Sequence, residues 1–130
     1  MLTFPYLQKG QHYFPVVDLT IGTSARSLTL KALVDSGASF SVFRAEVLEY
    51  LGLPLAKGER LYLEGIGGRI LGYRHRLPVV VGTTAFTLTI VFSQELAVSF
   101  NLLGRDNFFQ RFLVTFNERG RLVQLRSYRE

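Results

Sequence analysis

The chain carries an internal repeat at an offset of sixty residues, which restricts its fold to one built from two similar halves. Residues 21–30 align without a gap to residues 81–90, with five of the ten positions identical and four more closely similar. Each copy alternates apolar and β-branched residues around a short turn, a pattern typical of a strand, a turn and a second strand. A chance pair of similar hairpins is the competing interpretation.

The two copies continue in the same way, which favours duplication. Each runs into an apolar segment that ends at glycine, at residues 33–37 in the first half and 101–104 in the second. A short helical pattern follows each segment, at residues 44–51 and 105–112. We therefore expect a duplicated domain with one or two short helices.

The remaining patterns are those of an all-β domain. Further strands are expected at residues 79–81, 113–116 and 122–125, with a hairpin turn at 117–120. Because strands outnumber helices, the chain belongs to the all-β class. Its 130 residues, 48% of them hydrophobic, suffice for one core. We expect one domain over residues 1–130, with Met1 to Tyr6 and Arg121 to Arg129 as free terminal strands.

Composition excludes several classes of site. The chain has no cysteine, so it has no disulfide, no thiol nucleophile and no cysteine metal site. His12 and His75 lie far apart without companions at ligand spacing, so we expect no metal and no cofactor. The net charge of +5 is scattered along the chain, which argues against nucleic acid as a partner. The basic residues gathered within 69–76 favour a solvated hairpin, with a preference for acidic substrates as the alternative.

The hydropathy pattern predicts a soluble, cytoplasmic protein. No apolar run approaches the length of a membrane span. Residues 1–6 have neither the basic start nor the apolar body of a signal peptide. We therefore expect no membrane segment in this chain.

A single acid, Asp35, stands where the first apolar strand pattern ends. Residues 27–34 alternate and then become fully apolar, as in a strand that enters a core. A carboxylate at the point where such a strand meets a tight turn is costly in free energy, which favours a functional acid. Asp-Ser-Gly is also ordinary turn chemistry, so a plain turn is the alternative.

A second candidate element is a hairpin at about 61–73 with a glycine-rich tip. Gly65, Gly67 and Gly68 leave its backbone little steric restraint. Ile70 stands where a dinucleotide-binding fingerprint would need its third glycine, and no Lys-Ser or Lys-Thr follows as in a phosphate-binding loop. A functional lid and a plain hairpin turn both fit the pattern.

Three segments, taken in order, resemble the retropepsin-like aspartic proteases, single-domain relatives of pepsin that work as homodimers. Residues 35–39, Asp-Ser-Gly-Ala-Ser, resemble the catalytic loop of that family. Residues 64–68, Glu-Gly-Ile-Gly-Gly, resemble the tip of its flap, and residues 102–106, Leu-Leu-Gly-Arg-Asp, resemble the segment before its last helix. The similarity runs from about Phe14 to Phe116.

The resemblance implies an internally duplicated, closed β-barrel with its active site at a homodimer interface, where terminal strands of the two subunits interleave. It assigns catalysis to Asp35, Ser36 and Gly37. Binding of a peptide or protein substrate is implied for Ala38, Ser39, Glu64, Gly65, Ile66, Gly67 and Gly68. Structural support is implied for Leu102, Leu103, Gly104, Arg105 and Asp106, the first three packed beside the Asp35 loop.

Two positions depart from the viral members of the family. Ser36 stands where they usually have threonine, so the hydroxyl is kept and a packing methyl is lost. Ser39 stands where they carry a second aspartate that helps to hold the helix arginine. The partner of Arg105 is therefore open.

One such aspartate per chain is too few for peptide hydrolysis by carboxylates, which needs an acid and a base together. Two Asp35 side chains at a dimer axis would share one proton, because like charges about 3 Å apart cannot both ionise cheaply. We therefore expect an aspartic endopeptidase, a hydrolase that favours mildly acidic pH and apolar residues around the cut. A catalytically weak or inactive dimeric module that binds peptides on the same fold is the alternative. Serine hydrolysis is disfavoured, because Ser36 lacks the Gly-x-Ser-x-Gly elbow.

Overall fold

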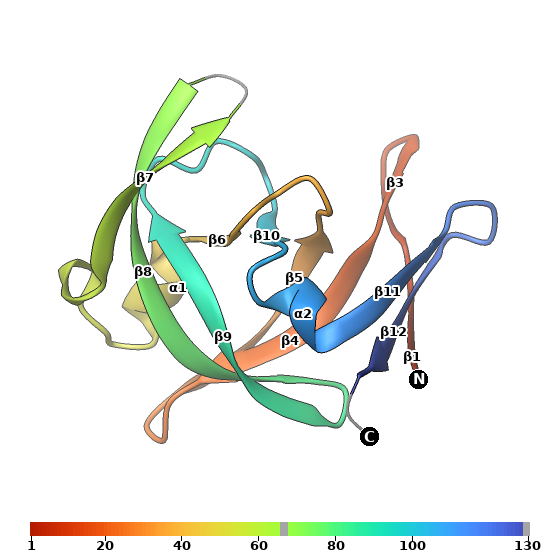
Figure 1. Ribbon diagram of the computed structural model, residues 1–130, viewed down its shortest axis with the longest axis horizontal. Helices are drawn as coiled ribbons and strands as arrows, with labels where there is room; N and C mark the ends of the chain where they lie inside the picture. Colours follow the sequence, from red (N-terminus) through yellow and green to blue (C-terminus); the bar gives the residue numbers. More distant parts are fainter. Residues whose placement is uncertain (66–67, 129–130) are drawn as a thin grey trace.

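Strands make up most of the protein, as the alternating patterns predict. The computed structural model describes residues 1–65 and 68–128 (Figure 1). The strands are β1 (Leu2–Pro5), β2 (Leu7–Lys9), β3 (His12–Phe14), β4 (Val16–Gly22), β5 (Ser27–Val34), β6 (Ser41–Arg44), β7 (Glu59–Gly65), β8 (Gly68–Val81), β9 (Thr84–Ser93), β10 (Asn101–Leu103), β11 (Phe112–Asn117) and β12 (Leu122–Ser127). The helical elements are α1 (Ala45–Tyr50), the 3-10 turn η1 (Leu55–Lys57) and α2 (Phe108–Arg111).

The largest sheet has the order β4-β5-β10-β6-β9-β8-β7, and β4 also pairs with β8. Its first six strands are arranged symmetrically: β10 and β6 are central, β5 and β9 flank them, and β4 and β8 lie outside. The repeat copies 21–30 and 81–90 fall on the β4-β5 and β8-β9 hairpins, which are equivalent pairs in this order. The duplication in the sequence therefore has a matching duplication in the sheet. The same symmetry makes β10 equivalent to β6, so residues 101–104 correspond to 41–44, and the expected match with 33–37 is wrong.

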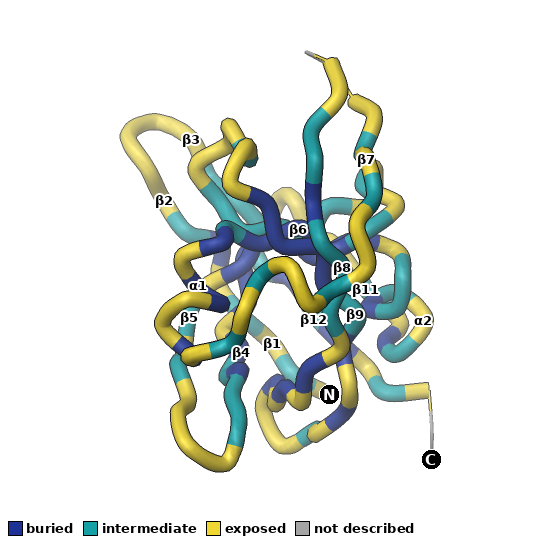
Figure 2. The backbone as a smooth tube through the Cα atoms, turned by 90° about the vertical axis from the view of Figure 1, so that its left-hand side faces the viewer, coloured by how far each residue is buried: buried dark blue, intermediate teal, exposed yellow. Residues whose placement is uncertain are grey.

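Apolar side chains from both halves meet in one core, which Figure 2 shows as the dark blue stretches of the chain. The largest fully buried side chains are the aromatic rings of Phe43, Phe92, Phe108 and Phe112. Phe43 of the first half meets Phe92 of the second edge to face, with ring centroids 6.0 Å apart. Such aromatic pairs stabilise a core beyond the area they bury, so this contact helps to join the two halves.

The two ends of the chain pair with each other. β12 lies between β1 and β11, antiparallel to both, in a separate three-stranded sheet. The expectation of free terminal strands is therefore wrong, because both edges of β12 already have partners within the chain. The outer edges of this sheet are β1 and β11, and Figure 1 shows β1 beside β12.

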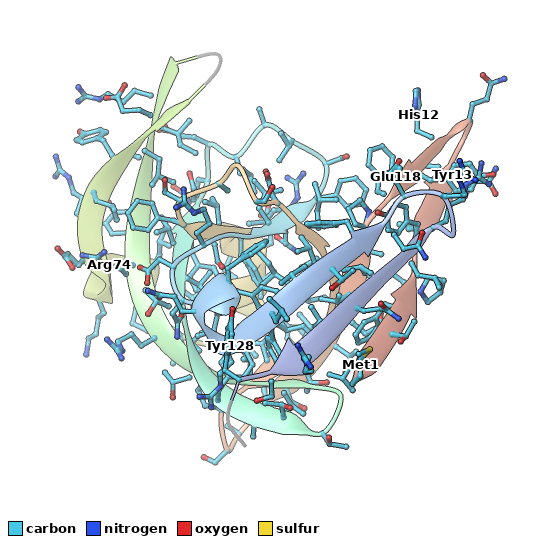
Figure 3. All side chains as sticks on the ribbon, turned by 45° about the vertical axis from the view of Figure 1, so that its right-hand side comes forward. Met1, His12, Tyr13, Arg74, Glu118 and Tyr128 are labelled. Atoms are coloured by element: carbon cyan, nitrogen blue, oxygen red, sulfur yellow. The ribbon has the colours of Figure 1, made fainter. Side chains whose placement is uncertain are left out.

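Tyr6 ties the N-terminal segment to the turn between β11 and β12. Its hydroxyl donates to Oε1 of Glu118 at 3.1 Å, and its backbone N–H donates to the carbonyl of Arg121 at 2.9 Å. The Arg121 guanidinium lies 3.6 Å from the ring centroid of Tyr13, so the β2-β3 hairpin is held at the same place (Figure 3). Burial, followed by the hydrogen bond to Glu118 and its charge, raises the pKa of the Tyr6 phenol.

Both helices are shorter than the sequence pattern predicts. α1 occupies the centre of the expected range 44–51, whereas α2 begins three residues after the expected start at Arg105. Before α2, Asp106 instead pairs with Phe40 in an isolated β-bridge, and the N–H groups of Arg105 and Asp106 donate to the carbonyls of Ala38 and Ser39. Within the described chain, neither helix has the length and apolar character needed to cross a membrane.

Removing the Tyr6 hydroxyl should lower the free energy of unfolding by about 1 kcal/mol at pH 7, the usual contribution of a partly buried hydrogen bond. Because the pKa is raised on folding, this contribution is complete below the ordinary tyrosine value of about 10 and is lost as the pH rises through the higher folded-state value. Denaturant unfolding of Tyr6→Phe measures it. Tyr128→Phe, at a side chain 62% exposed, is the control and should match the wild type. Equal stability of Tyr6→Phe and the wild type would contradict this role.

Candidate active site

Asp35 lies in the turn between β5 and β6, directly after Val34, the buried last residue of β5. Its backbone N–H donates to the carbonyl of Leu103 at 2.9 Å, which holds the residue against β10. Its carboxylate Oδ1 accepts the backbone N–H of Gly37 at 3.0 Å. The side chain is half-buried, and its Oδ2 has no hydrogen-bond partner within residues 1–65 and 68–128. The turn therefore orients the carboxylate and leaves one of its oxygens available.

Ser36 and Gly37 form the exposed corner of the same turn, and Ala38 begins the return toward β6. The N–H of Ala38 donates to the carbonyl of Asp35 at 3.2 Å, which closes the turn. A Cβ at position 37 would lie 3.4 Å from Oδ1 of Asp35, an ordinary contact distance. In this structure position 37 therefore acts through its backbone N–H, which donates to the carboxylate, and a small side chain would fit there.

β10 brings residues of the second half against this turn. It runs parallel to β5, with Leu102 opposite Leu33 and Leu103 opposite Val34. It also runs antiparallel to β6, with Leu102 opposite Val42. The strand thus lies between the two strands that flank Asp35, which is the placement the resemblance implied for Leu102 and Leu103.

Gly104 marks the closest approach between the halves. A Cβ here would overlap the carbonyl of Phe40 and would lie 2.8 Å from the carbonyl oxygen of Ala38. The next two residues continue the contact, since the N–H of Arg105 donates to Ala38 at 2.8 Å and that of Asp106 to Ser39 at 2.9 Å. Residues 104–106 therefore hold the Asp35 turn through their backbone.

Two further residues, Ser41 and Asn107, support this contact and were missed in the sequence. Ser41 is fully buried, and its Oγ accepts the N–H of Gly104 at 3.0 Å. The side-chain amide of Asn107 accepts the N–H of Thr89 at 2.9 Å and donates to the carbonyl of Thr87 at 3.0 Å. It thus bonds the backbone of β9 in the way that a paired strand does. Two features of the sequence could have pointed to these residues. Ser41 is a hydroxyl residue next to apolar ones, and Asn107 stands directly before a helix.

The glycine-rich hairpin is formed by β7 and β8 and is longer than the expected range 61–73. Its pairing starts at Glu59 opposite Arg74 and ends at Gly65 opposite Gly68, whose φ of 115° favours glycine. Glu64 lies opposite Arg69 near the tip. The other two predicted flap residues, Ile66 and Gly67, lie outside the described residues. Figures 1 and 2 show the hairpin projecting from the body of the protein.

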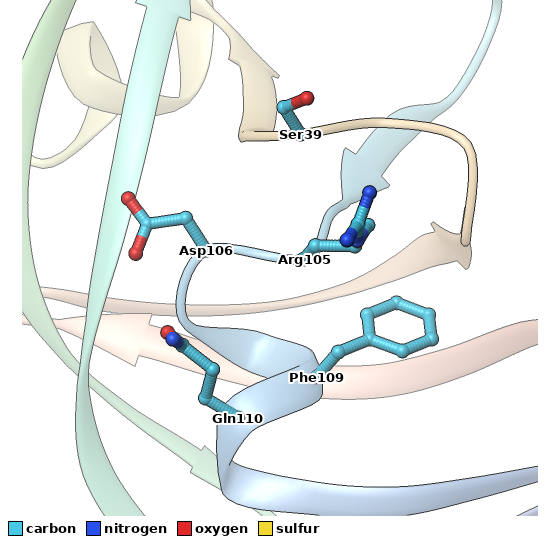
Figure 4. Close-up of a pocket in the computed structure, with 5 residues that line it drawn as sticks. All are labelled: Ser39, Arg105, Asp106, Phe109 and Gln110. Carbon is cyan, nitrogen blue, oxygen red and sulfur yellow. The ribbon is translucent and has the colours of Figure 1, made fainter.

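A pocket of about 470 Å³ lies between the Asp35 turn and α2 (Figure 4). It is lined by Ser39, Arg105, Asp106, Phe109 and Gln110, and so contains three predicted site residues without Asp35 itself. Ser39 offers a hydroxyl where a carboxylate would pair with the arginine. In the described part of the chain the Arg105 guanidinium forms no ion pair, so its partner stays open.

The segments that form this arrangement coincide with a known family. A family profile described as aspartyl protease, from the retropepsin-like clan, matches residues 17–107, which is well over half of the chain. The chain belongs to the aspartyl protease family. The match includes the Asp35 turn, the β7-β8 hairpin and β10. A search of curated proteins found no match.

The histidines of this aspartyl protease family member are separate from the Asp35 turn. Nε2 of His75 lies 2.9 Å from the carbonyl oxygen of Leu55, and its ring meets Phe92 edge to face at 5.6 Å. His75 therefore fastens η1 to β8, whereas His12 is exposed on β3 (Figure 3). Among residues 1–65 and 68–128, no three metal-ligating side chains lie close enough together to hold an ion.

Gly104→Ala should destabilise this aspartyl protease fold by about 2 kcal/mol, because the added methyl group meets backbone that cannot move aside without breaking hydrogen bonds of the Asp35 turn. Urea unfolding measures the loss. Gly65→Ala is the matched control, since a Cβ there meets no atom of residues 1–65 and 68–128 within 4 Å and the backbone is not in the left-handed region. The two variants unfolding at the same denaturant concentration would contradict the close approach at Gly104.

Proposed function

We propose that this protein is an aspartic endopeptidase in which two copies of the chain build one active site. The observation that carries the proposal is the carboxylate of Asp35, oriented through Oδ1 by Gly37 and half-buried at the end of β5. Membership of the aspartyl protease family supports it. Hydrolysis by carboxylates needs a proton donor and a proton acceptor at the same bond. A second copy of Asp35 supplies the missing partner.

The mechanism follows from two Asp35 carboxylates that share one proton. The ionised carboxylate takes a proton from a water molecule between them, and the water oxygen attacks the scissile carbonyl carbon. The protonated carboxylate donates to the carbonyl oxygen, which gives a tetrahedral intermediate. When that intermediate collapses, the carboxylate that took the proton from water gives it to the leaving nitrogen, and the C–N bond breaks. The other carboxylate takes a proton from one hydroxyl of the intermediate, which restores the shared proton. Activity should fall at high pH, where both carboxylates are ionised, and at low pH, where both are protonated.

The other predicted residues have supporting roles in this proposal. Ser36 and Gly37 hold the loop, with the Ser36 hydroxyl bonding across the dimer, while Ala38 and Ser39 contact the substrate. The flap residues Glu64, Gly65, Ile66, Gly67 and Gly68 close over an extended peptide and exclude water. Leu102, Leu103, Gly104, Arg105 and Asp106 support the Asp35 turn from the second half. We also infer that the β4-β8 pairing closes the main sheet into a barrel that keeps these parts in register.

The terminal sheet supports a specific form of the dimer. Both edges of β12 are occupied, so a second copy can pair with this sheet only along β1 or β11, its two outer strands. Of these two, β11 carries two exposed apolar side chains, Leu113 and Phe116, whereas Leu2 and Phe4 of β1 are partly buried. An unpaired edge with exposed apolar residues is a template for another strand. We infer that the second copy adds along β11.

Asp35→Asn should abolish peptide cleavage, because an amide can neither take a proton from water nor share one with a second carboxylate. The assay is cleavage of a peptide library by wild type and variant across the acidic and neutral pH range, with an inhibitor of aspartic proteases as a further arm. The Asp18→Asn variant is the control, since Asp18 is an exposed acid paired with Lys31 on the surface. Equal cleavage by wild type and Asp35→Asn would remove Asp35 from the mechanism.

Leu113→Lys should weaken the dimer about tenfold or more, since a charge at the edge of β11 is placed against the second copy. Sedimentation equilibrium measures the dissociation constant. Val80→Lys is the matched control, because Val80 is 39% exposed, close to the 40% of Leu113, but lies on β8 in the other sheet. Dimerisation that is unchanged by Leu113→Lys would rule out the β11 edge as the interface.

A further inference from the structure

The β7-β8 hairpin leaves the body of the protein at Gly72. Pairing between β8 and β9 begins at Tyr73 opposite Phe92, and nearer the tip β8 pairs with β7 alone. Gly72 is buried, and a Cβ there would overlap Cγ1 of Val91. The hairpin therefore crosses close to β9 at Gly72. Beyond this point the β9 ladder no longer holds it.

The side chains of Ser93 and Glu95 hold the hairpin just beyond that crossing. Oε1 of Glu95 accepts the backbone N–H of Leu71 at 2.9 Å, and Oγ of Ser93 donates to the Leu71 carbonyl at 2.7 Å. The same Oγ accepts the N–H of Glu95 at 3.0 Å. Ser93 is 2% exposed, so its hydroxyl depends on these partners. We call this set of three hydrogen bonds the Ser93–Glu95 clasp.

Glu95 also occupies the repeat position of Asp35. The two acids are sixty residues apart, the offset of the repeat, and each follows the end of an equivalent strand, β5 or β9. Asp35 accepts an N–H from its own turn, whereas Glu95 accepts one from the hairpin. The second half thus retains an acid at the repeat position and uses it to hold Leu71.

The loop that carries Glu95 is fixed to the rest of the site. The Arg44 guanidinium donates to the carbonyl of Val98, and the Arg44 N–H donates to Oδ1 of Asn101 at 2.8 Å. Asn101 begins β10, whose Leu103 carbonyl accepts the N–H of Asp35. A continuous series of hydrogen bonds and short chain segments therefore connects Leu71 with the Asp35 turn.

We propose that Ser93 and Glu95 are positioning residues, which fix the base of the glycine-rich hairpin relative to Asp35. Because the clasp holds Leu71, the hairpin can bend only between Leu71 and its tip. A flap whose base is fixed returns to the same place over the carboxylates, which lowers the cost of closing on a peptide. The catalytic part of this inference rests on the proposed endopeptidase function, and the structural part does not.

The test uses two readouts on the full chain, amide hydrogen exchange at Leu71 and peptide cleavage kinetics. Glu95→Ala removes the acceptor, so the Leu71 amide should exchange about tenfold faster, as expected for the loss of one hydrogen bond. Exchange in β12 should not change, because the clasp does not touch the terminal sheet. kcat/KM should fall about tenfold, with most of the loss in KM, since the chemical groups at Asp35 are intact.

Two variants separate the clasp from a general effect on the loop. Glu95→Gln keeps a carbonyl oxygen on a side chain of the same length. Leu71 exchange and kcat/KM should therefore both stay near the wild-type values. Gln94→Ala alters the exposed neighbouring residue, whose side chain forms no hydrogen bond in the described ranges, and should behave as wild type. Ser93→Ala should reproduce the effect of Glu95→Ala, because it removes the other two bonds.

Unchanged exchange at Leu71 in Glu95→Ala overturns the inference, whatever the activity of the protein. Faster exchange with unaltered kinetics also overturns it, because the clasp would then hold the hairpin without positioning it for substrate. If the wild type cleaves no peptide, the proposed function fails. In that case the dissociation constant for a peptide is measured in place of KM. If Glu95→Ala leaves this dissociation constant unchanged, the positioning role is overturned.

Discussion

The insertion of β10 between β5 and β6 is the constraint on which the rest of the structure depends. This strand of the second half completes the sheet of the first half, and its Leu103 carbonyl holds the N–H of Asp35. The insertion is possible only because Gly104 has no side chain to collide with Phe40. Since the contact joins segments far apart in sequence, it forms only after a large loop has closed. The hydrogen bond from β10 that holds the Asp35 turn is therefore present only once the two halves are packed together.

The duplicated sheet also explains how two acids at the same repeat position serve different purposes. After β5 the chain turns at once, and Gly37 directs the Asp35 carboxylate toward the surface. After β9 the chain instead continues in a longer loop, and Glu95 reaches the base of the hairpin. In the proposed mechanism one half supplies the reacting acid and the other supplies support. Because each chain contributes one Asp35, that mechanism makes assembly of two chains part of catalysis.

Much of this arrangement could be predicted from the sequence, because local patterns specify strands and turns. The repeat predicted the paired hairpins β4-β5 and β8-β9, and the Asn117–Gly120 segment predicted the turn that separates β11 from β12. The pairing of β1 with β12 could not be predicted, because sequence periodicity indicates where a strand lies and not which strand it pairs with. The start of α2 was misplaced for a related reason. The residues with helical periodicity at 105–106 are held by carbonyls of the distant segment 38–39.

The supporting residues of the site were the hardest to predict. Ser41 acts through one hydrogen bond and Asn107 through two, all to backbone groups that only the folded chain brings near them. Glu95 lies at the repeat offset from Asp35, but the residues between Ile90 and Glu95 no longer resemble those between Leu30 and Asp35, so the alignment ends before it. Asp35, the proposed catalytic residue, was easier to find, because its small neighbours and the preceding apolar strand are both local signals.

Mixing wild-type chains with Asp35→Asn chains tests the central claim, a shared active site, most directly. After subunit exchange at a fixed total concentration, peptide cleavage is measured as the wild-type fraction is lowered. If each site needs Asp35 from both subunits, only dimers of two wild-type chains cleave, and an equal mixture retains about a quarter of the full activity. Activity that falls in simple proportion, to about half in the equal mixture, would show that each chain works alone and would contradict the account.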